Sequence, residues 1–146
     1  MAYKVFENGK VAINDTNLNE TQDLIHEDIN GEMIYGNTTN SNSGSNSEIT
    51  LTKTIKNTDR VKIFFKTDNY DTYSSVEILN ANNKAVSLTA TRASGSYPYI
   101  FLADIRINEN KITWGRNAGF YFMNNSAIEN QNTKLLITHV IRYSKK

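Results

Sequence analysis

The stretch Val61-Lys62-Ile63-Phe64-Phe65-Lys66 decides the fold class. Apolar residues at positions 61, 63 and 65 alternate with a second set that includes two lysines. Because successive side chains of a β-strand point to opposite faces of the sheet, this period of two places one apolar face against a core. The other face meets water. The segment therefore predicts a strand of an antiparallel sheet that has one covered face.

The same period recurs along most of the chain on both sides of this segment. It appears in the pairs Ile49 and Leu51, Val76 and Ile78, Val86 and Leu88, Ile105 and Ile107, and Leu135 and Ile137. Short strands separated by regular turn signals are typical of a sandwich or barrel. Long helical patterns are missing, which disfavours a parallel α/β fold. We expect an all-β protein, with residues 33–146 forming an antiparallel β-sandwich of jelly-roll-like type.

Two segments depart from the alternation because they are apolar on both faces. They are the run 97–103, Tyr-Pro-Tyr-Ile-Phe-Leu-Ala, and the run 135–141, Leu-Leu-Ile-Thr-His-Val-Ile. A strand of this kind is covered on both sides, either within its own domain or by another subunit. In a small antiparallel domain this pattern favours a homo-oligomer.

Residues 1–32 predict a separate arm, made of a short hairpin and a short helix. Asn8-Gly9 is a strong signal for a tight hairpin turn between residues 3 and 13. Asp15 or Thr16 can cap a helix that Gly31 can stop. Its apolar stripe contains Leu18, Ile25 and Ile29, which is too thin to stabilise an isolated helix. We therefore expect these three residues to attach the arm to a partner surface.

The bulk composition narrows the function classes. The chain has 146 residues, a formal net charge of +1 and no cysteine. A length of this order fits one domain with a short arm. The charge balance gives no general reason to expect nucleic acid or an anionic membrane as partner. No apolar window approaches the length of a membrane span, and the N-terminus lacks the apolar region of a signal peptide.

No constellation of residues predicts catalysis, a metal or another cofactor. His26 and His139 have no neighbours at a ligand spacing. The segment 68–71, Asp-Asn-Tyr-Asp, lacks most of a calcium loop, and a hairpin turn is the better interpretation. The segment 115–119, Gly-Arg-Asn-Ala-Gly, is interpreted as a tight connection between strands. We expect a protein that is not an enzyme.

If the protein recognises a host surface, loops are expected to make the contact, since loops on a rigid sandwich can vary while the core stays fixed. The candidates are the turn 67–72 with Tyr70 and Tyr73, and the connection from Arg92 to Tyr97. Tyrosine rings stack on sugars and arginine donates hydrogen bonds to hydroxyl groups. For Tyr70 and Tyr73 the alternative of ordinary packing stays open. Core packing is expected instead for Trp114, Phe120 and Phe122.

Several segments resemble appendage proteins of bacteriophages that infect Gram-positive bacteria. They are ITLTKTIKNTDRVKIFFK at 49–66, YSSVEILNANNKAVSLTA at 73–90 and LLITHVIRY at 135–143. The resemblance covers about residues 33–146. Residues 4–19, KVFENGKVAINDTNLN, are similar to openings that dock an appendage onto a virion. No shaft, coiled coil or collagen-like segment separates the two parts, so a compact decoration, adaptor or tip protein fits better than a long fibre.

The resemblance implies a virion structural protein of the tail, collar or capsid-decorating layer. It implies assembly in the host cytoplasm, contacts with other virion proteins and a homo-oligomer, with a trimer favoured. Contact with host cell-wall polysaccharide is a further expectation. A free-standing carbohydrate-binding module is the alternative. A hydrolase on a sandwich fold has little support, because no paired carboxylates can be identified.

Overall fold

The computed structural model describes residues 4–5, 12–13, 31–36, 47–68, 72–94, 97–124, 126–130 and 134–144. These residues form eleven strands and contain no helix. The strands are β1 (Lys4–Val5), β2 (Ala12–Ile13), β3 (Glu32–Gly36), β4 (Glu48–Thr50), β5 (Arg60–Thr67), β6 (Tyr73–Ile78), β7 (Ala85–Ser94), β8 (Tyr97–Asn108), β9 (Lys111–Met123), β10 (Ser126–Asn130) and β11 (Leu135–Tyr143). Since no helix is present in these ranges, none of them contains a helix that could span a membrane.

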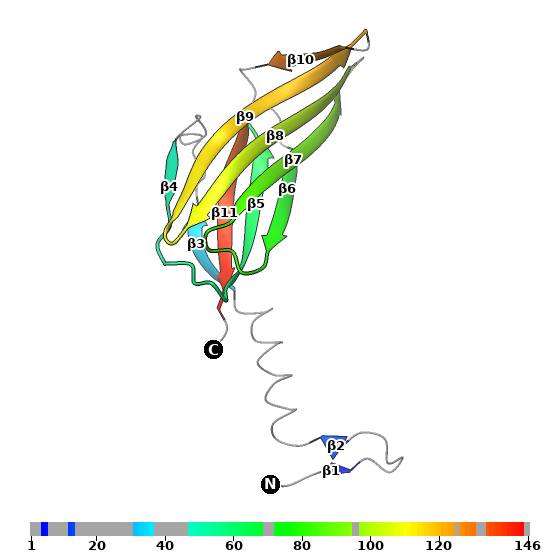
Figure 1. Ribbon diagram of the computed structural model, residues 1–146. Coiled ribbons are helices and arrows are strands. Elements are labelled where there is room, and N and C mark those ends of the chain that lie inside the picture. The colour runs from blue at the N-terminus through cyan, green and yellow to red at the C-terminus, as the bar shows by residue number, and fades with distance from the viewer. Residues whose placement is uncertain are drawn as a thin grey trace.

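The described residues between 31 and 144 form two sheets whose neighbouring strands all run antiparallel. The long sheet has the order β10-β9-β8-β7, and β4 also pairs with β9. The short sheet has the order β3-β11-β5-β6. The long sheet lies in front of the short sheet in Figure 1. The prediction of an all-β, antiparallel fold is confirmed.

The core lies between the two sheets and follows the period of two. In β5, Val61, Ile63 and Phe65 are buried, while the residues between them are only half-buried. The long sheet supplies its own alternating set to the same cluster, and residues 49–55 close it at one side. The fully buried large side chains are Trp114, Phe65, Phe101, Ile34, Ile49, Ile55, Ile63, Leu88, Ile105, Ile107, Ile112 and Leu135.

Strand β9 runs without a break through the segment that the sequence suggested was a connection. Residues 115–119 all lie within β9, so that prediction is wrong. The extra length is absorbed by a bulge, in which Gly115 and Arg116 together lie opposite Asp104 of β8. A β-carbon at Gly115 would lie 3.4 Å from the Asp104 carbonyl oxygen, which is ordinary van der Waals contact.

After the bulge, Asn117 points into the core and ties the two sheets together. Its Nδ2 donates a hydrogen bond to the Leu135 carbonyl oxygen, and its Oδ1 accepts one from the Leu135 N–H, both at 2.8 Å. Asn117 and Leu135 are both buried. A buried amide that satisfies both backbone groups of one residue fixes the end of β11 against the long sheet.

The long sheet continues past this tie, and its continuation is the distal extension. It comprises residues 89–94 of β7, 97–102 of β8, 118–123 of β9 and the whole of β10. The described strands of the short sheet stop near Asn117, at Thr67, Tyr73 and Leu135. In Figure 1 the distal extension is the upper right part of the long sheet.

The N-terminal predictions are tested only in part. Lys4 pairs with Ile13 and Val5 with Ala12, so the predicted hairpin is confirmed at these four residues. The predicted helix, with Leu18, Ile25 and Ile29, lies outside the described residues. Gly31 is described, and a β-carbon there would overlap Ile141 Cγ2 and the Tyr143 ring. Close packing against β11 is therefore one reason for glycine at this position.

Candidate interaction surfaces

The outer face of the distal extension is apolar along β8 and β9, although the short sheet does not cover this side, and its polar positions are Thr89 and Thr91 on β7 and Glu129 on β10. Leu102 is 42% exposed and Phe122 is 38% exposed. Ile100 pairs with Phe120, and both are half-buried on the same side of the sheet. Pro98 and Ala127 are exposed beside them. We define the distal apolar face as Pro98, Ile100, Leu102, Phe120, Phe122 and Ala127.

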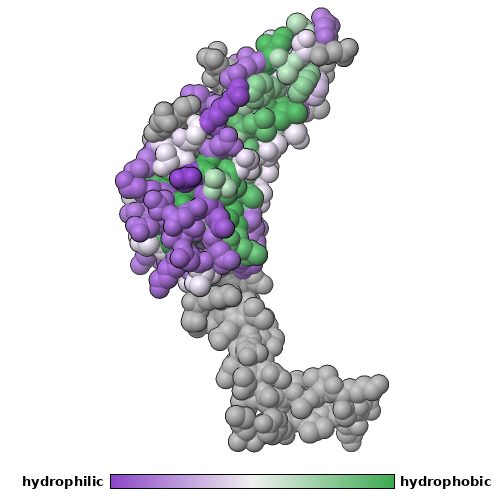
Figure 2. All heavy atoms as spheres, viewed as in Figure 1, coloured by the Kyte–Doolittle hydropathy of each residue, from purple (hydrophilic) through white to green (hydrophobic). Residues whose placement is uncertain are grey.

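The outer positions of the same strands become polar nearer the bulge and beyond it. They carry Ser87 on β7, Asp104 and Arg106 on β8, and Thr113 on β9. Figure 2 shows this change, because hydrophobic residues gather over the upper part of the visible face and polar residues cover much of the lower part. Contiguous apolar patches on a protein surface commonly mark a site of interaction.

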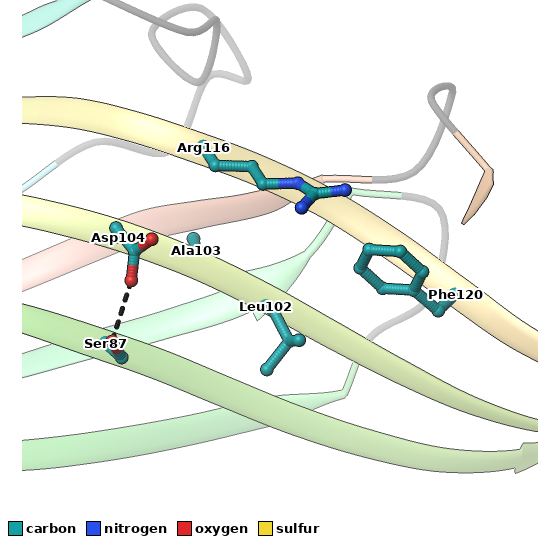
Figure 3. Close-up of a pocket in the computed structure, with 6 residues that line it drawn as sticks. All are labelled: Ser87, Leu102, Ala103, Asp104, Arg116 and Phe120. Atoms are coloured by element: carbon teal, nitrogen blue, oxygen red, sulfur yellow. Dashed lines mark hydrogen bonds between the residues drawn. The ribbon is translucent and has the colours of Figure 1, made fainter. Parts of the chain in front are cut away.

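A shallow pocket marks the border between the apolar and polar parts (Figure 3). It has a volume of about 200 Å³ and is lined by Ser87, Leu102, Ala103, Asp104, Arg116 and Phe120. The Ser87 hydroxyl lies 2.7 Å from Asp104 Oδ1 in a hydrogen bond. The volume is below the ~300 Å³ at which ordinary small-molecule pockets begin. The pocket therefore fits an inserted side chain better than a small-molecule ligand.

Arg116 is already partnered at this border. Its Nη2 donates a hydrogen bond of 2.8 Å to Glu129 Oε2 on β10, and the two charges form an ion pair. Its guanidinium carbon also lies 5.2 Å from the centre of the Phe120 ring. The border of the distal apolar face thus carries one positive and one negative charge that neutralise each other.

The inner face of the distal extension carries three tyrosines, of which Tyr121 contacts the other two. The ring centre of Tyr121 lies 5.8 Å from that of Tyr99 and 6.2 Å from that of Tyr97. The Tyr99 ring stacks on Phe101 at 6.3 Å. Arg92 lies opposite Tyr99 across the β7–β8 pair. We define Tyr97, Tyr99 and Tyr121 as the tyrosine cluster.

Two of the predicted ligand residues therefore share one face, but their setting differs from the prediction. Arg92 and Tyr97 both belong to strands, since β7 extends to Ser94 and β8 begins at Tyr97. Tyr99 and Tyr121 join them, although neither belongs to the two loops in which the sequence predicted ligand contacts. Tyr97 and Tyr99 are two residues apart in one strand, so the sequence predicts that they share a face. Tyr121 reaches them only because β8 pairs with β9, and no local sequence pattern predicts that pairing.

The other two predicted ligand residues do not join this cluster. Tyr73 lies on the outer face of the short sheet and is 64% exposed. The Lys66 Nζ lies 5.8 Å from its ring centre, and Lys62 and Arg60 lie similarly over Phe64 and Tyr143. Tyr70 lies outside the described residues.

The titratable groups of the described residues form no recognisable metal cluster. No group of three or more His, Asp or Glu side chains is close enough to hold a metal ion in this part of the chain. His139 is exposed on the short sheet, with its ring edge-on to Phe64 at 6.5 Å. Asp68 Oδ1 accepts a hydrogen bond of 3.0 Å from the Lys134 N–H, so this carboxylate is tied to the backbone.

Comparisons with known proteins identify no relative of this chain. No family model matches the chain, and neither a curated protein nor a solved structure matches it.

Proposed function

We propose that this chain is a non-enzymatic structural protein of a bacteriophage virion, located in the tail, the collar or the capsid-decorating layer. The observation that carries the proposal is the distal extension, which has apolar or aromatic residues on both faces. Contact of such an apolar surface with water is unfavourable, so covering it by another protein surface lowers the free energy. It suits a component of a larger assembly better than a module that works alone. The phage assignment itself rests on the sequence resemblance.

In this proposal the two sheets form a jelly-roll-like β-sandwich, and residues 1–32 form the arm that attaches it to the virion. Leu18, Ile25 and Ile29 supply the apolar stripe by which the arm docks. The partners are other virion proteins and further copies of the chain. A trimer is favoured by the resemblance alone. The chain requires no cofactor and acts without metal.

A free-standing carbohydrate-binding module is the second candidate, and the tyrosine cluster is the observation that favours it. Aromatic rings bind sugars through their apolar faces, while hydroxyl and guanidinium groups hydrogen-bond sugar hydroxyls. However, Tyr99 stacks on the core residue Phe101 and contacts Tyr121, so much of its surface is already occupied. The tyrosine cluster therefore supports sugar binding less strongly than the distal apolar face supports assembly. Contact with a host polysaccharide remains compatible with the virion role.

The test is whether the full-length tagged chain is found in particles purified by density gradient from cells that produce the source phage. The structural role predicts that the chain sediments with the particles at a constant ratio to the other virion proteins. A chain that is absent from particles, but binds isolated cell walls on its own, would favour the carbohydrate-binding module. The double substitution Tyr97→Ala with Tyr121→Ala should then abolish wall binding.

A further inference from the structure

We propose that the distal apolar face packs against the same surface of another copy of this chain. This inference rests on the proposed homo-oligomer and specifies a two-fold contact within it, which gives a dimer in place of the trimer that the resemblance favours. The inner face of the extension and the outer face of the short sheet are assigned no part in this contact.

The shape of the surface favours another sheet as its occupant. The distal apolar face is formed by paired strands, with Ile100 opposite Phe120, and Phe122 opposite Ala127 of β10. Two sheets pack face to face about 10 Å apart when the facing side chains are apolar. Leu102 and Phe122 are the most exposed of the large side chains on this surface, at 42% and 38%. They are the side chains that a facing sheet would bury most.

The charges of the surface favour an identical copy over a partner of opposite charge. The six residues of the distal apolar face are uncharged, and Glu129, which lies opposite Phe120 on the same side of the sheet, is paired with Arg116 within the chain at 2.8 Å. Two copies can therefore meet without bringing like charges together. A symmetric contact requires a surface that is complementary to itself, and an uncharged apolar face meets this requirement.

The border pocket limits how far the contact between the two copies extends, and it can fix how the two surfaces are aligned. Leu102 and Phe120 form its apolar walls, while Asp104 and Ser87 form its polar side. A large side chain from the other copy can enter the apolar half, whereas burial of the exposed Asp104 carboxylate would be costly. The contact is therefore expected to end at the bulge rather than to continue over the polar half of the sheet.

Cysteine cross-linking tests this inference directly, because the chain has no cysteine of its own. The variants are Ile100→Cys, Leu102→Cys, Phe120→Cys and Phe122→Cys in the full-length chain. Each is oxidised alone, and the variants are also mixed in pairs, since a disulfide forms only when the two Cα atoms approach within about 7 Å. Leu79→Cys is the matched control, because Leu79 is 67% exposed and lies in the turn between β6 and β7.

The expected result is a covalent dimer in most of the protein for at least one variant or mixture, and none for the Leu79→Cys control. Light scattering on the unmodified chain separates the remaining outcomes. An oligomer without cross-links at the distal apolar face would overturn this inference and leave the proposed oligomer standing. A monomeric chain would overturn both the inference and the oligomer on which it rests. Cross-linking of the control to the same extent would show random collision and also count against the contact.

Discussion

The two halves of the long sheet are made from the same three strands, yet they differ in what covers them. In the half near the bulge, inner residues such as Ile105 and Trp114 are buried against the short sheet, and outer residues such as Asp104 are polar. In the distal extension the outer residues of β8 and β9 include Leu102, Phe120 and Phe122 instead, while β7 keeps the polar Thr89 and Thr91. Strand propensity cannot explain a change within one strand. The difference supports the proposal that another copy of the chain covers the outer face of the distal half.

The largest expected effect contrasts two aromatic residues of β9, one from each half. Trp114→Ala should lower the free energy of unfolding by about 3–5 kcal/mol, because it empties a fully buried site. Phe122→Ala should cost less than about 1 kcal/mol when unfolding is measured on the isolated monomer, because its side chain is part-exposed there. Urea denaturation of both variants measures the two values. Equal losses would contradict the contrast between the halves.

The second prediction concerns the tie at the boundary between the halves. Asn117→Ala removes two buried hydrogen bonds and leaves the Leu135 N–H and carbonyl without this partner. The expected loss is about 2–4 kcal/mol, since each unsatisfied buried group is costly. Asn108→Ala is the matched control, because Asn108 is exposed on β8. Similar small losses for both variants would show that Asn117 does not hold the sheets together.

The third prediction tests a polar tie at the opposite end of the short sheet. Arg142 donates hydrogen bonds to Glu32 Oε2 at 2.7 Å and to the Thr54 carbonyl oxygen at 2.6 Å. Its Nη1 also lies 4.0 Å from the buried Asp59 carboxylate. Arg142→Gln should therefore destabilise the protein by about 1–3 kcal/mol. Arg106→Gln, at an exposed position of β8, is the control and should leave the melting temperature nearly unchanged.

The smallest effect on stability is expected at the border of the distal apolar face. Arg116→Ala removes an exposed ion pair with Glu129, and such pairs contribute only about 0–1 kcal/mol. The same substitution leaves the Glu129 charge unpaired beside the contact between copies. Dissociation of the oligomer should therefore become easier at low salt, while thermal stability of the monomer changes little. Sedimentation at two salt concentrations measures the first effect, and calorimetry measures the second.

The sequence predicted the fold class because a period of two is a local signal. The alternation of residues 61–66 becomes strand β5 with the expected face buried. The two apolar faces predicted for 97–103 are also present, with Phe101 buried on one side and Leu102 part-exposed on the other. Alternation identifies the faces of a strand, but it does not say what covers them. For this reason Phe122 was expected in the core, and it is 38% exposed instead.

The features that the sequence missed depend on pairing between distant segments. The bulge at Gly115 and Arg116 looked like a turn, because two glycines at short spacing are common in connections. The tie from Asn117 to Leu135 joins residues 18 positions apart and has no composition signal. Arg92 and Tyr97 looked like loop residues because Ser-Gly-Ser stands between them, whereas both lie at strand ends. Each of these features is determined by contacts between residues that are far apart in the sequence.

The most direct test of the contrast between the two halves is the mass of the full-length chain in solution, measured by light scattering at micromolar concentration. The chain has a mass of 16.6 kDa, and a homogeneous species of twice this mass is expected from a two-fold contact. Leu102→Ser combined with Phe122→Ser should weaken the association at least about tenfold, while Leu79→Ser should not change it. A folded 16.6 kDa monomer, or an oligomer that the double substitution leaves intact, would contradict a contact through the distal apolar face.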